Sequence, residues 1–393
     1  MTLVVPAAWP DSGSEVHLSE EPFDVVEVPV RRAGDVNRHR YVDEDLRELV
    51  RRLDPDVVDL HMEPFSSACH QWLTAAGARP LVAYTAQNVD KRFPPPFARY
   101  ERQALERLQG LYPCSRQAAS VARGKGFHGL VEVLPLGVPT GPAMGSQRAD
   151  DDEVALALVG RLVPEKGVSD AVRVLERLRA HRRTRLVIAG AGPEEALART
   201  LVAHLGLSGS VEFRPWQSAA QLEALYRETH VVLVPSSATQ TWVEQFGRTI
   251  VEGQAAGAVV AGYASGSIPE VAGPAGILVP EHDVDGLAAA VLAALADVQD
   301  FSERRSRGLA AAGERTWAEV ARRQVSFYES AAAAPRLARQ RGGRRRERLS
   351  AIQEFGPTAT LAGPSVRPFA LPVLRRDVGW TRLLARALDL LAP

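Results

Sequence analysis

Residues 244–270, EQFGRTIVEGQAAGAVVAGYASGSIPE, combine a turn, the start of a helix, a strand and a second turn of small residues. The stretch holds two carboxylates, Glu244 and Glu252, eight positions apart. On one regular helix, that spacing corresponds to about 800° of rotation, which leaves the two side chains about 80° apart. We therefore expect Glu244 to precede the helix and Glu252 to lie one turn inside it. Such an arrangement can hold a polyhydroxylated, phosphorylated ligand.

The turn Phe246-Gly247-Arg248 lies between the two carboxylates and is predicted to open the helix. With Gly247 at the helix start, the free backbone N–H groups of Phe246, Gly247 and Arg248 point toward an anion. The helix dipole and the Arg248 side chain add positive potential at the same place. The turn therefore predicts an anion site beside Glu244.

Apolar, β-branched runs alternate with amphipathic stretches over most of the 393 residues, which is typical of an α/β protein with parallel sheets covered by helices on both faces. Strands are expected at 2–5, 25–30, 57–61, 81–85, 111–113, 131–134, 154–159, 185–189, 211–213, 231–234, 258–261 and 276–279. Helices are expected at 42–53, 66–75, 98–108, 115–125, 167–180, 194–205, 219–227, 248–256 and 284–296. The length and the Gly-, Pro- and Asp-rich segment 137–152 indicate two domains, residues 1–140 and 153–330, joined by a linker.

The composition excludes several classes of protein. With 47 basic and 47 acidic residues, the charge is balanced, which disfavours a nucleic-acid binder. Cys69 and Cys114 are the only cysteines in the sequence, so we expect neither a disulfide framework nor a Cys-ligated metal site, and a reducing cytosol fits. No apolar run reaches the roughly 18 residues that cross a bilayer, and the chain start lacks the basic region of a signal peptide. We expect a cytoplasmic protein without a metal.

Residues 331–393 differ from the rest, passing from an alanine run through RLARQRGGRRRERLS (336–350) to a terminal segment. Apolar residues of that segment repeat at helical spacing, namely Trp380, Leu383, Leu384, Ala387, Leu388 and Leu391. One interpretation is a basic linker followed by an amphipathic helix that packs on the protein. The other is a peripheral contact with an anionic membrane, such as the inner face of the plasma membrane.

The expected strand 154–159 runs directly into GRLVPEKG, residues 160–167. Ligands of doubly wound sheets bind outside the carboxyl ends of the strands, so Arg161 and Lys166 are placed to face a ligand. Two fixed cations can stabilise the charge on a departing nucleoside diphosphate without a divalent metal. The alternative is a pair of solvated charges on an ordinary turn.

Gly190 and Gly192 follow the next expected strand. The dinucleotide-binding pattern G-x-G-x-x-G fails here, because its third glycine position holds Glu195. A glycine turn that lets the chain reverse near a ligand is favoured over a dinucleotide site.

The second half resembles the donor half of the retaining GT-B glycosyltransferases of family 4 in the order and spacing of its motifs, GRLVPEKG, GAGP, LVPSS, EQFGRTIVE, GSIPE and GILVP. The first half is similar to the acceptor half of bacterial group 1 members in YTAQNVDKRFPPPF, YERQALERLQGLYPCS and VLPLGV. The resemblance implies two Rossmann-like, doubly wound parallel-sheet domains that face a cleft.

The same resemblance implies roles for the residues above. Arg161 and Lys166 would contact the diphosphate, and Glu244 would lie against the transferred sugar, which makes these three the expected catalytic residues. Glu252 would accept hydrogen bonds from the ribose hydroxyls, a role that suits an ionised carboxylate. The rest of the expected donor-binding set is Gly160, Gly190, Gly192, Phe246, Gly247 and Arg248. The alternative for both glutamates is ordinary charge on a helix surface.

Acceptor recognition is expected from loops that end the strands of the first domain. The candidates are His61, Glu63, Gln87 and Asn88. His61 could transfer a proton, because the ordinary pKa of histidine lies near neutrality. A satisfied histidine at the end of a buried strand is the alternative.

The first domain departs from the family pattern at its start. Family members open with a strand, a glycine-rich turn and a long helix, whereas TLVVPAAWP, residues 2–10, looks like the second strand of that domain. We therefore expect the first domain to lack the opening strand and helix, a loss that would expose unpaired backbone.

Together these features predict an enzyme that moves a sugar from a nucleotide-diphosphate sugar to a hydroxyl acceptor with retention of configuration. No cofactor is expected, and the resemblance places the reaction in envelope polysaccharide or glycolipid synthesis. One alternative is a nucleotide-sugar epimerase of the same fold. Another is a catalytically silent protein that binds nucleotide sugars or a membrane.

Overall fold

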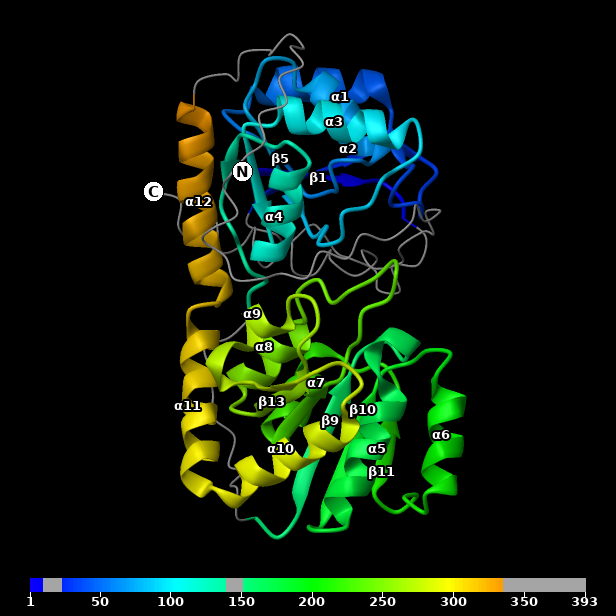
Figure 1. Cartoon of the computed structure of the whole chain (residues 1–393). Coiled ribbons are helices and arrows are strands. Elements are labelled where there is room, and N and C mark those ends of the chain that lie inside the picture. The colour runs from blue at the N-terminus through cyan, green and yellow to red at the C-terminus, as the bar shows by residue number, and fades with distance from the viewer. Residues whose placement is uncertain (10–22, 139–150, 335–393) are drawn as a thin grey trace.

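The computed structural model describes residues 1–9, 23–138 and 151–334. Figure 1 shows two α/β domains, one above the other in that view, with helices α11 and α12 along one side. The first domain, in blue and cyan, comes from the N-terminal part of the chain, and the second domain is drawn in green and yellow.

The second domain is built on one six-stranded sheet. Its strands are β9 (Val154–Val159), β10 (Thr184–Ala189), β11 (Val211–Arg214), β12 (Val231–Val234), β13 (Val259–Tyr263) and β14 (Ile277–Val279). All neighbours are parallel, in the order β11-β10-β9-β12-β13-β14. The strand order therefore reverses between β9 and β12, where doubly wound sheets bind their ligands.

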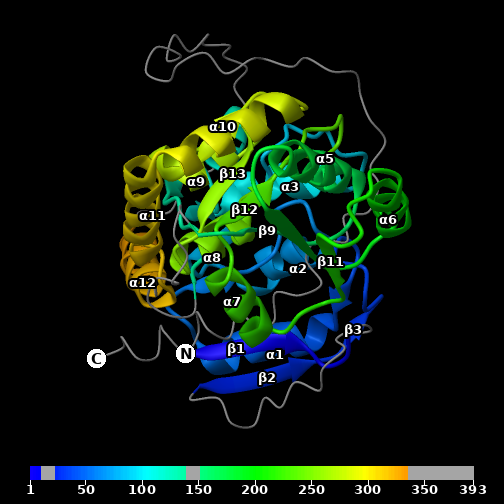
Figure 2. The ribbon, with the colours of Figure 1, turned by 90° about the horizontal axis from the view of Figure 1, so that it is seen from below.

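Helices cover both faces of this sheet, as Figure 2 shows. On one face, α5 (Val168–Arg179), α6 (Glu195–His204) and α10 (Val284–Ala296) share a buried apolar cluster with the strands. On the other face lie α7 (Ala219–Arg227) and α8 (Arg248–Ala255). Because both faces are covered, a central strand such as VALALV is a continuous apolar run.

The first domain holds two separate parallel sheets and a short hairpin. One sheet pairs β1 (Thr2–Pro6) with β2 (Asp24–Val28). The other has the order β5 (Val58–Leu60), β6 (Leu81–Thr85), β7 (Gly110–Pro113) and β8 (Leu130–Val131). β3 (Val30–Arg31) and β4 (Arg40–Tyr41) form the hairpin. Within the described residues, no strand joins the two parallel sheets. That the domain lacks an opening strand and helix stays a prediction.

Helices α1 (Asp43–Leu53), α2 (Ser67–Ala75), α3 (Phe97–Arg107) and α4 (Arg116–Gly124) pack around the strands of the first domain. Their apolar sides join the strands in one buried cluster. α2 and α4 begin where the sequence predicts, because the hydroxyls of Ser66 and Ser115 accept hydrogen bonds from the first-turn backbone N–H groups of Cys69 and Ala118.

Every expected strand and helix occurs, with ends shifted by at most three residues, except that the expected strand 25–30 is divided at Pro29 into β2 and β3. The structure also contains the short 3-10 helices η2 (Pro164–Lys166) and η3 (Gly273–Ala275). Where only a small-residue turn is expected, residues Ile268–Ala272 form the helix α9. That expectation is wrong because Pro269, which sits in the first turn of α9, favours a helix start.

Two further helices, α11 (Val298–Gly313) and α12 (Trp317–Ala333), were not expected. α12 packs against the first domain. Its Phe327 ring lies 6.0 Å from the ring of Tyr112 in β7, and Arg323 donates to the carbonyl of Val133 at 2.8 Å. The chain leaves the first domain at Val138 and returns at Thr316, where these two residues form a parallel bridge.

α12 extends to Ala333, so the basic tail begins later than the expected residue 331. The expected basic linker and terminal amphipathic helix fall in residues 335–393, outside the described part of the chain. In the ranges that are described, no helix combines the length and the apolar character needed to span a bilayer.

Candidate active site

The polar residues expected at the donor site gather where the strand order reverses. Gly160 and Arg161 follow β9, and Ser236 and the loop that carries Glu244 follow β12. These two strands are neighbours, with Val231 opposite Leu156. The carboxyl ends of the two strands therefore bring together residues that are more than 70 positions apart in sequence.

Glu244 lies before α8 and is 6% exposed. Its Oε2 atom is 2.5 Å from Nζ of Lys166 and accepts a hydrogen bond from Oγ of Ser236 at 3.2 Å. The ammonium of Lys166 also lies 5.2 Å from the ring centre of Trp242, within the range of a cation–π contact. The structure thus joins two of the three expected catalytic residues in one partly buried ion pair.

Arg161, the third expected catalytic residue, follows β9 in the same loop that leads to Lys166 and is partly exposed. No residue in the described ranges forms a hydrogen bond or an ion pair with its guanidinium. Gly160, just before it, has a φ of 146°, and a Cβ atom there would meet nothing within 4 Å. The backbone at Gly160 therefore borders open space next to a cation available for an anionic ligand.

The start of α8 has the geometry that the sequence predicts. Gly247 is its N-cap with a left-handed φ of 79°, a conformation that favours glycine. Among the described residues, none accepts a hydrogen bond from the backbone N–H of Phe246, Gly247 or Arg248. The Phe246 side chain is 4% exposed and belongs to a buried cluster, so only its backbone can face a ligand.

Arg248 and Glu252 contact each other. Nη2 of Arg248 lies 2.8 Å from one carboxylate oxygen of Glu252, and the hydroxyl of Tyr226 donates to the other oxygen at 3.0 Å. A carboxylate offers about four acceptor positions, so Glu252 keeps capacity for further hydroxyl groups. The Arg248 guanidinium is directed toward Glu252, so part of the positive potential expected from it is neutralised by that carboxylate.

Gly190 and Gly192 bring two loops into backbone contact. A Cβ atom on Gly190 would lie 1.8 Å from the carbonyl oxygen of Gly160, and one on Gly192 would lie 2.2 Å from that of Leu162. Neither approach leaves room for a side chain. These two glycines therefore allow the loop after β10 to pack directly on the backbone of the loop that carries Arg161. Their contact with a ligand stays a prediction.

His61 directly follows β5 in the first domain. Its ring stacks on Tyr84 at a centroid distance of 4.7 Å, and its Nδ1 atom is 3.4 Å from the hydroxyl of Tyr112. Burial lowers the pKa of His61 to about 4. The packed aromatic rings disfavour the charged imidazolium, which favours the alternative of a buried histidine after a strand; proton transfer by His61 stays a prediction.

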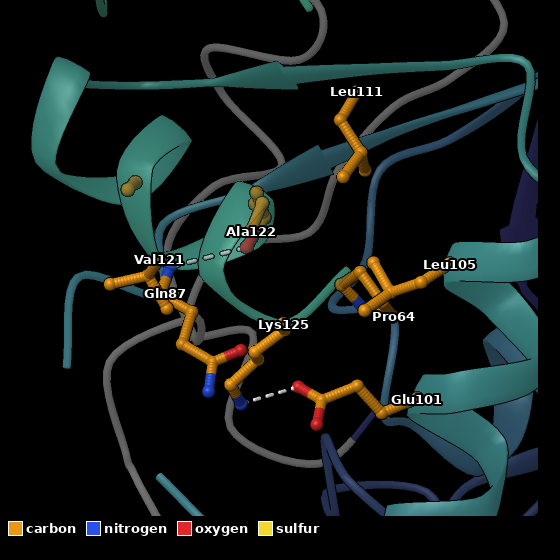
Figure 3. Close-up of a pocket in the computed structure, with 10 residues that line it drawn as sticks. Pro64, Gln87, Glu101, Leu105, Leu111, Val121, Ala122 and Lys125 are labelled. Carbon is orange, nitrogen blue, oxygen red and sulfur yellow. Dashed lines mark hydrogen bonds and ion pairs between the residues drawn. The ribbon is translucent and has the colours of Figure 1, made fainter. Parts of the chain in front are cut away.

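Glu63 and Gln87 are held inside the first domain. Glu63 accepts from Oγ1 of Thr85 at 2.8 Å and from the backbone N–H of Ala86 at 2.9 Å, and burial raises the pKa of its carboxyl group. Gln87 points into a small cavity of about 10 Å³, drawn in Figure 3, which has room for one water molecule. This cavity is too small for a sugar.

On the polar side of that cavity, the side chains of Gln87, Glu101 and Lys125 are linked by hydrogen bonds. Lys125 lies 2.7 Å from a carboxylate oxygen of Glu101, as the dashed line in Figure 3 shows. With its amide nitrogen turned toward Glu101, Gln87 donates to Glu101 at 3.1 Å and accepts from Lys125 at 2.7 Å. Lys125 also donates to the carbonyl of Lys91 at 2.8 Å, which fixes the loop that follows β6.

Asn88, in that same loop, reaches the second domain. Its Nδ2 atom donates to the carbonyl oxygen of Glu244 at 2.8 Å. Gln245 makes the reverse contact, donating from Nε2 to the carbonyl of Ala86 at 3.0 Å. The sequence does not single out Ser236, Trp242, Tyr226 or Gln245, because their contacts with Glu244, Lys166, Glu252 and Ala86 arise from the tertiary fold. The described residues contain no group of three or more His, Cys, Asp or Glu side chains arranged to hold a metal ion.

Comparison with known families covers both halves of the chain. Residues 143–310 match the family described as Glycosyl transferases group 1, and residues 1–141 match Glycosyltransferase Family 4.

Among curated relatives, the chain is 34% identical over 215 residues to an MMP alpha-(1->4)-mannosyltransferase of Mycolicibacterium hassiacum, covering 52% of this chain and 49% of the relative. It is 34% identical over 206 residues to a D-inositol 3-phosphate glycosyltransferase of Mycolicibacterium smegmatis, covering 49% and 45%. The matched region thus spans about half the length of these relatives.

Solved structures with a similar fold include the sucrose-phosphate synthase of Thermosynechococcus elongatus, with a TM-score of 0.63, 17% identity and coverage of 84% of this chain and 88% of that chain. Anabaena HepE in complex with UDP has a TM-score of 0.59 and 18% identity, covering 73% and 81%. The expected GT-B architecture of two Rossmann-like domains is confirmed. Since both halves match and the fold is shared, the chain belongs to the group 1 glycosyltransferases of family 4.

Proposed function

We propose that this protein transfers a sugar from a nucleotide-diphosphate sugar to a hydroxyl group of an acceptor, with retention of configuration at the anomeric carbon. The observation that carries the proposal is the Lys166–Glu244 pair at the sheet edge where the strand order reverses, where Arg161 follows β9 and α8 begins after the loop that follows β12. Family membership supports the reaction class.

In this proposal, the diphosphate binds between Arg161, Lys166 and the backbone N–H groups at the start of α8. Oriented backbone donors and fixed cations hold an anion without a metal. The ribose hydroxyls donate to Glu252, and the sugar lies against Glu244. UDP in the HepE complex supports a nucleoside diphosphate as the ligand class.

Transfer breaks the bond between the anomeric carbon and the diphosphate oxygen, and forms a bond from that carbon to the acceptor oxygen. The acceptor proton passes to the departing diphosphate oxygen, so the reaction needs no base from the protein. Arg161 and Lys166 stabilise the negative charge that develops on the leaving group. Because attack and departure occur on one face of the sugar, configuration is retained.

A binding and product experiment tests this function. The full chain, treated with EDTA, is titrated with UDP-, GDP- and ADP-sugars in a calorimeter, and products are then identified with and without candidate acceptors. We expect one donor to bind and to yield an acceptor-dependent glycoside with retained configuration. A changed sugar formed from donor alone would instead identify an epimerase. Binding without turnover would identify a silent nucleotide-sugar-binding protein.

Arg161→Ala gives a residue-level test of the same proposal. Loss of a charge-assisted contact to the diphosphate should weaken nucleotide binding about tenfold. Arg185→Ala is a matched control, because Arg185 lies in β10 beside Glu153 at 3.6 Å. Equal affinity in wild type and Arg161→Ala would contradict the assignment.

The names of the relatives support a role in glycoconjugate synthesis on a polyhydroxylated acceptor. We propose that this occurs at the cytoplasmic face of the membrane, with the arginine-rich segment 336–348 in contact with anionic lipid. The full chain should co-sediment with phosphatidylglycerol vesicles and not with phosphatidylcholine vesicles. Arg344→Glu, Arg345→Glu and Arg346→Glu together should abolish co-sedimentation, and no difference between the two vesicle types would contradict the proposal.

A further inference from the structure

The main chain of Glu244 is held from both domains. Its carbonyl oxygen accepts from the backbone N–H of Ser267 at 3.0 Å, within the second domain. The same oxygen accepts from Nδ2 of Asn88 at 2.8 Å, across the domain boundary. Asn88 is 5% exposed, so this hydrogen bond is shielded from water. One carbonyl group therefore uses both of its acceptor positions on opposite sides of the interface.

Gln245, the residue after Glu244, forms a second hydrogen bond across the boundary, in which the second domain donates and the first domain accepts. Nε2 of Gln245 donates to the carbonyl of Ala86 at 3.0 Å, two residues before Asn88. The N–H of Ala86 is in turn fixed by the carboxylate of Glu63 at 2.9 Å. Two opposed hydrogen bonds between residues 86–88 and 244–245 set the relative position of the two loops.

Close packing removes the remaining freedom of this segment. A Cβ atom on Gly266 would lie 2.5 Å from the carbonyl oxygen of Glu244 and 3.1 Å from its nitrogen. On the side-chain end, the carboxylate is engaged by Lys166 at 2.5 Å and by Ser236 at 3.2 Å. The carboxylate of Glu244 is thus held by residues of the second domain. Its main-chain carbonyl is held by Ser267 of the second domain and by Asn88 of the first.

We propose that Asn88 is a positioning residue, which sets the carboxylate of Glu244 for sugar transfer only when the two domains are in contact. The proposal rests on the proposed role of Glu244 against the donor sugar. Asn88 touches the main chain of Glu244 and acts through it. The arrangement couples the acceptor-side loop after β6 to the orientation of the donor sugar.

The kinetic test compares Asn88→Ala and Asn88→Asp with Glu270→Ala. Glu270 is a matched control, because its carboxylate also crosses the boundary, accepting from the backbone N–H of Arg116 at 2.9 Å, but it does not contact Glu244. Both Asn88 variants should lower kcat about tenfold, the loss of one buried hydrogen bond. Their nucleotide affinity should stay within twofold, and Glu270→Ala should keep kcat within twofold. Equal losses in all three variants would show general weakening of the interface and overturn the proposal.

A double-mutant cycle separates this inference from the role of Glu244 itself. In a Glu244→Ala background, Asn88→Ala should change kcat by less than twofold, because the carboxylate that Asn88 positions is gone. A tenfold loss in both backgrounds would overturn the proposal and indicate an independent contact with substrate. If Glu244→Ala alone left transfer unchanged, the proposed role of Glu244 would fail, which is a different result.

Hydrogen–deuterium exchange provides a readout that does not require turnover. Removing the Asn88 contact should speed exchange at the N–H of Ser267, which shares the Glu244 carbonyl. Gln245→Ala removes the hydrogen bond from Gln245 to the carbonyl of Ala86 and should also speed exchange at Ser267. This variant tests the proposal if the Asn88 variants do not fold. Unchanged exchange at Ser267 in the folded variants would overturn the proposal.

Discussion

Nζ of Lys166 lies 2.5 Å from Oε2 of Glu244, although the two residues come from loops after different strands, β9 and β12. Their side chains are 22% and 8% exposed. A charge in such a position is costly without its partner, because the surrounding protein solvates it less well than water. The pair therefore fixes the relative position of the two loops that border the proposed diphosphate and sugar sites.

Lys166→Ala should reduce both transfer and stability. Loss of a cation at the leaving group should lower kcat about a hundredfold. The free energy of unfolding should fall by about 1–3 kcal/mol, because the carboxylate of Glu244 is left without its cation. The double variant Lys166→Ala/Glu244→Ala should be more stable than Lys166→Ala alone in urea unfolding. Strictly additive losses would contradict an energetically coupled pair.

Glu252→Ala should weaken nucleotide binding about tenfold, because it removes acceptors for the ribose hydroxyls. Tyr226→Phe should have a smaller effect, since it removes only the hydroxyl that donates to Glu252 at 3.0 Å. Glu223→Ala is the control on α7, where Glu223 pairs with Arg227 at the surface. Calorimetry with UDP and GDP measures the affinities, and unchanged binding of both by Glu252→Ala would rule out the ribose contact.

The stability of the protein should depend on pH through His61. Its pKa is about 4 in the folded protein and about 6.5 when exposed in the unfolded chain, so the unfolded state binds more protons between these values. The contribution of His61 to stability is therefore present above pH 6.5 and is lost as the pH falls toward 4. His61→Gln should show a smaller loss of stability between pH 7 and pH 4.5 in urea unfolding. Parallel pH dependence in the two proteins would argue against a buried neutral imidazole.

Gly192→Ala should destabilise the second domain by about 1–3 kcal/mol, because the added methyl group would lie 2.2 Å from the carbonyl oxygen of Leu162. Gly209→Ala is the matched control, since a Cβ atom there meets nothing within 4 Å. The control should change stability by no more than about 0.5 kcal/mol. Denaturant midpoints compare the two, and similar midpoints would mean that the loop after β10 can move away from the loop after β9.

Local patterns predicted the elements of this fold because each depends on near neighbours in sequence. Apolar runs identified the covered strands, and the spacing of Glu244 and Glu252 correctly placed one before α8 and the other within it. By contrast, α12 was not expected, because the surface on which it packs includes Tyr112, about two hundred positions earlier. The lowered pKa of His61 could not be predicted from the sequence either, since it results from burial against Tyr84 and Tyr112, which come from other strands.

The α/β class, most strands and helices, and the residue types of the proposed donor site follow from the sequence alone, because periodicity and motif spacing are local properties. The pairing of charges that are distant in sequence depends on the three-dimensional fold. It joined Lys166 to Glu244, 78 positions apart, and left Arg161 without a partner in the described ranges. It also placed Asn88 on the main chain of Glu244, 156 residues away. Such contacts depend on which strand ends meet and how the two domains face each other, which no local spacing specifies.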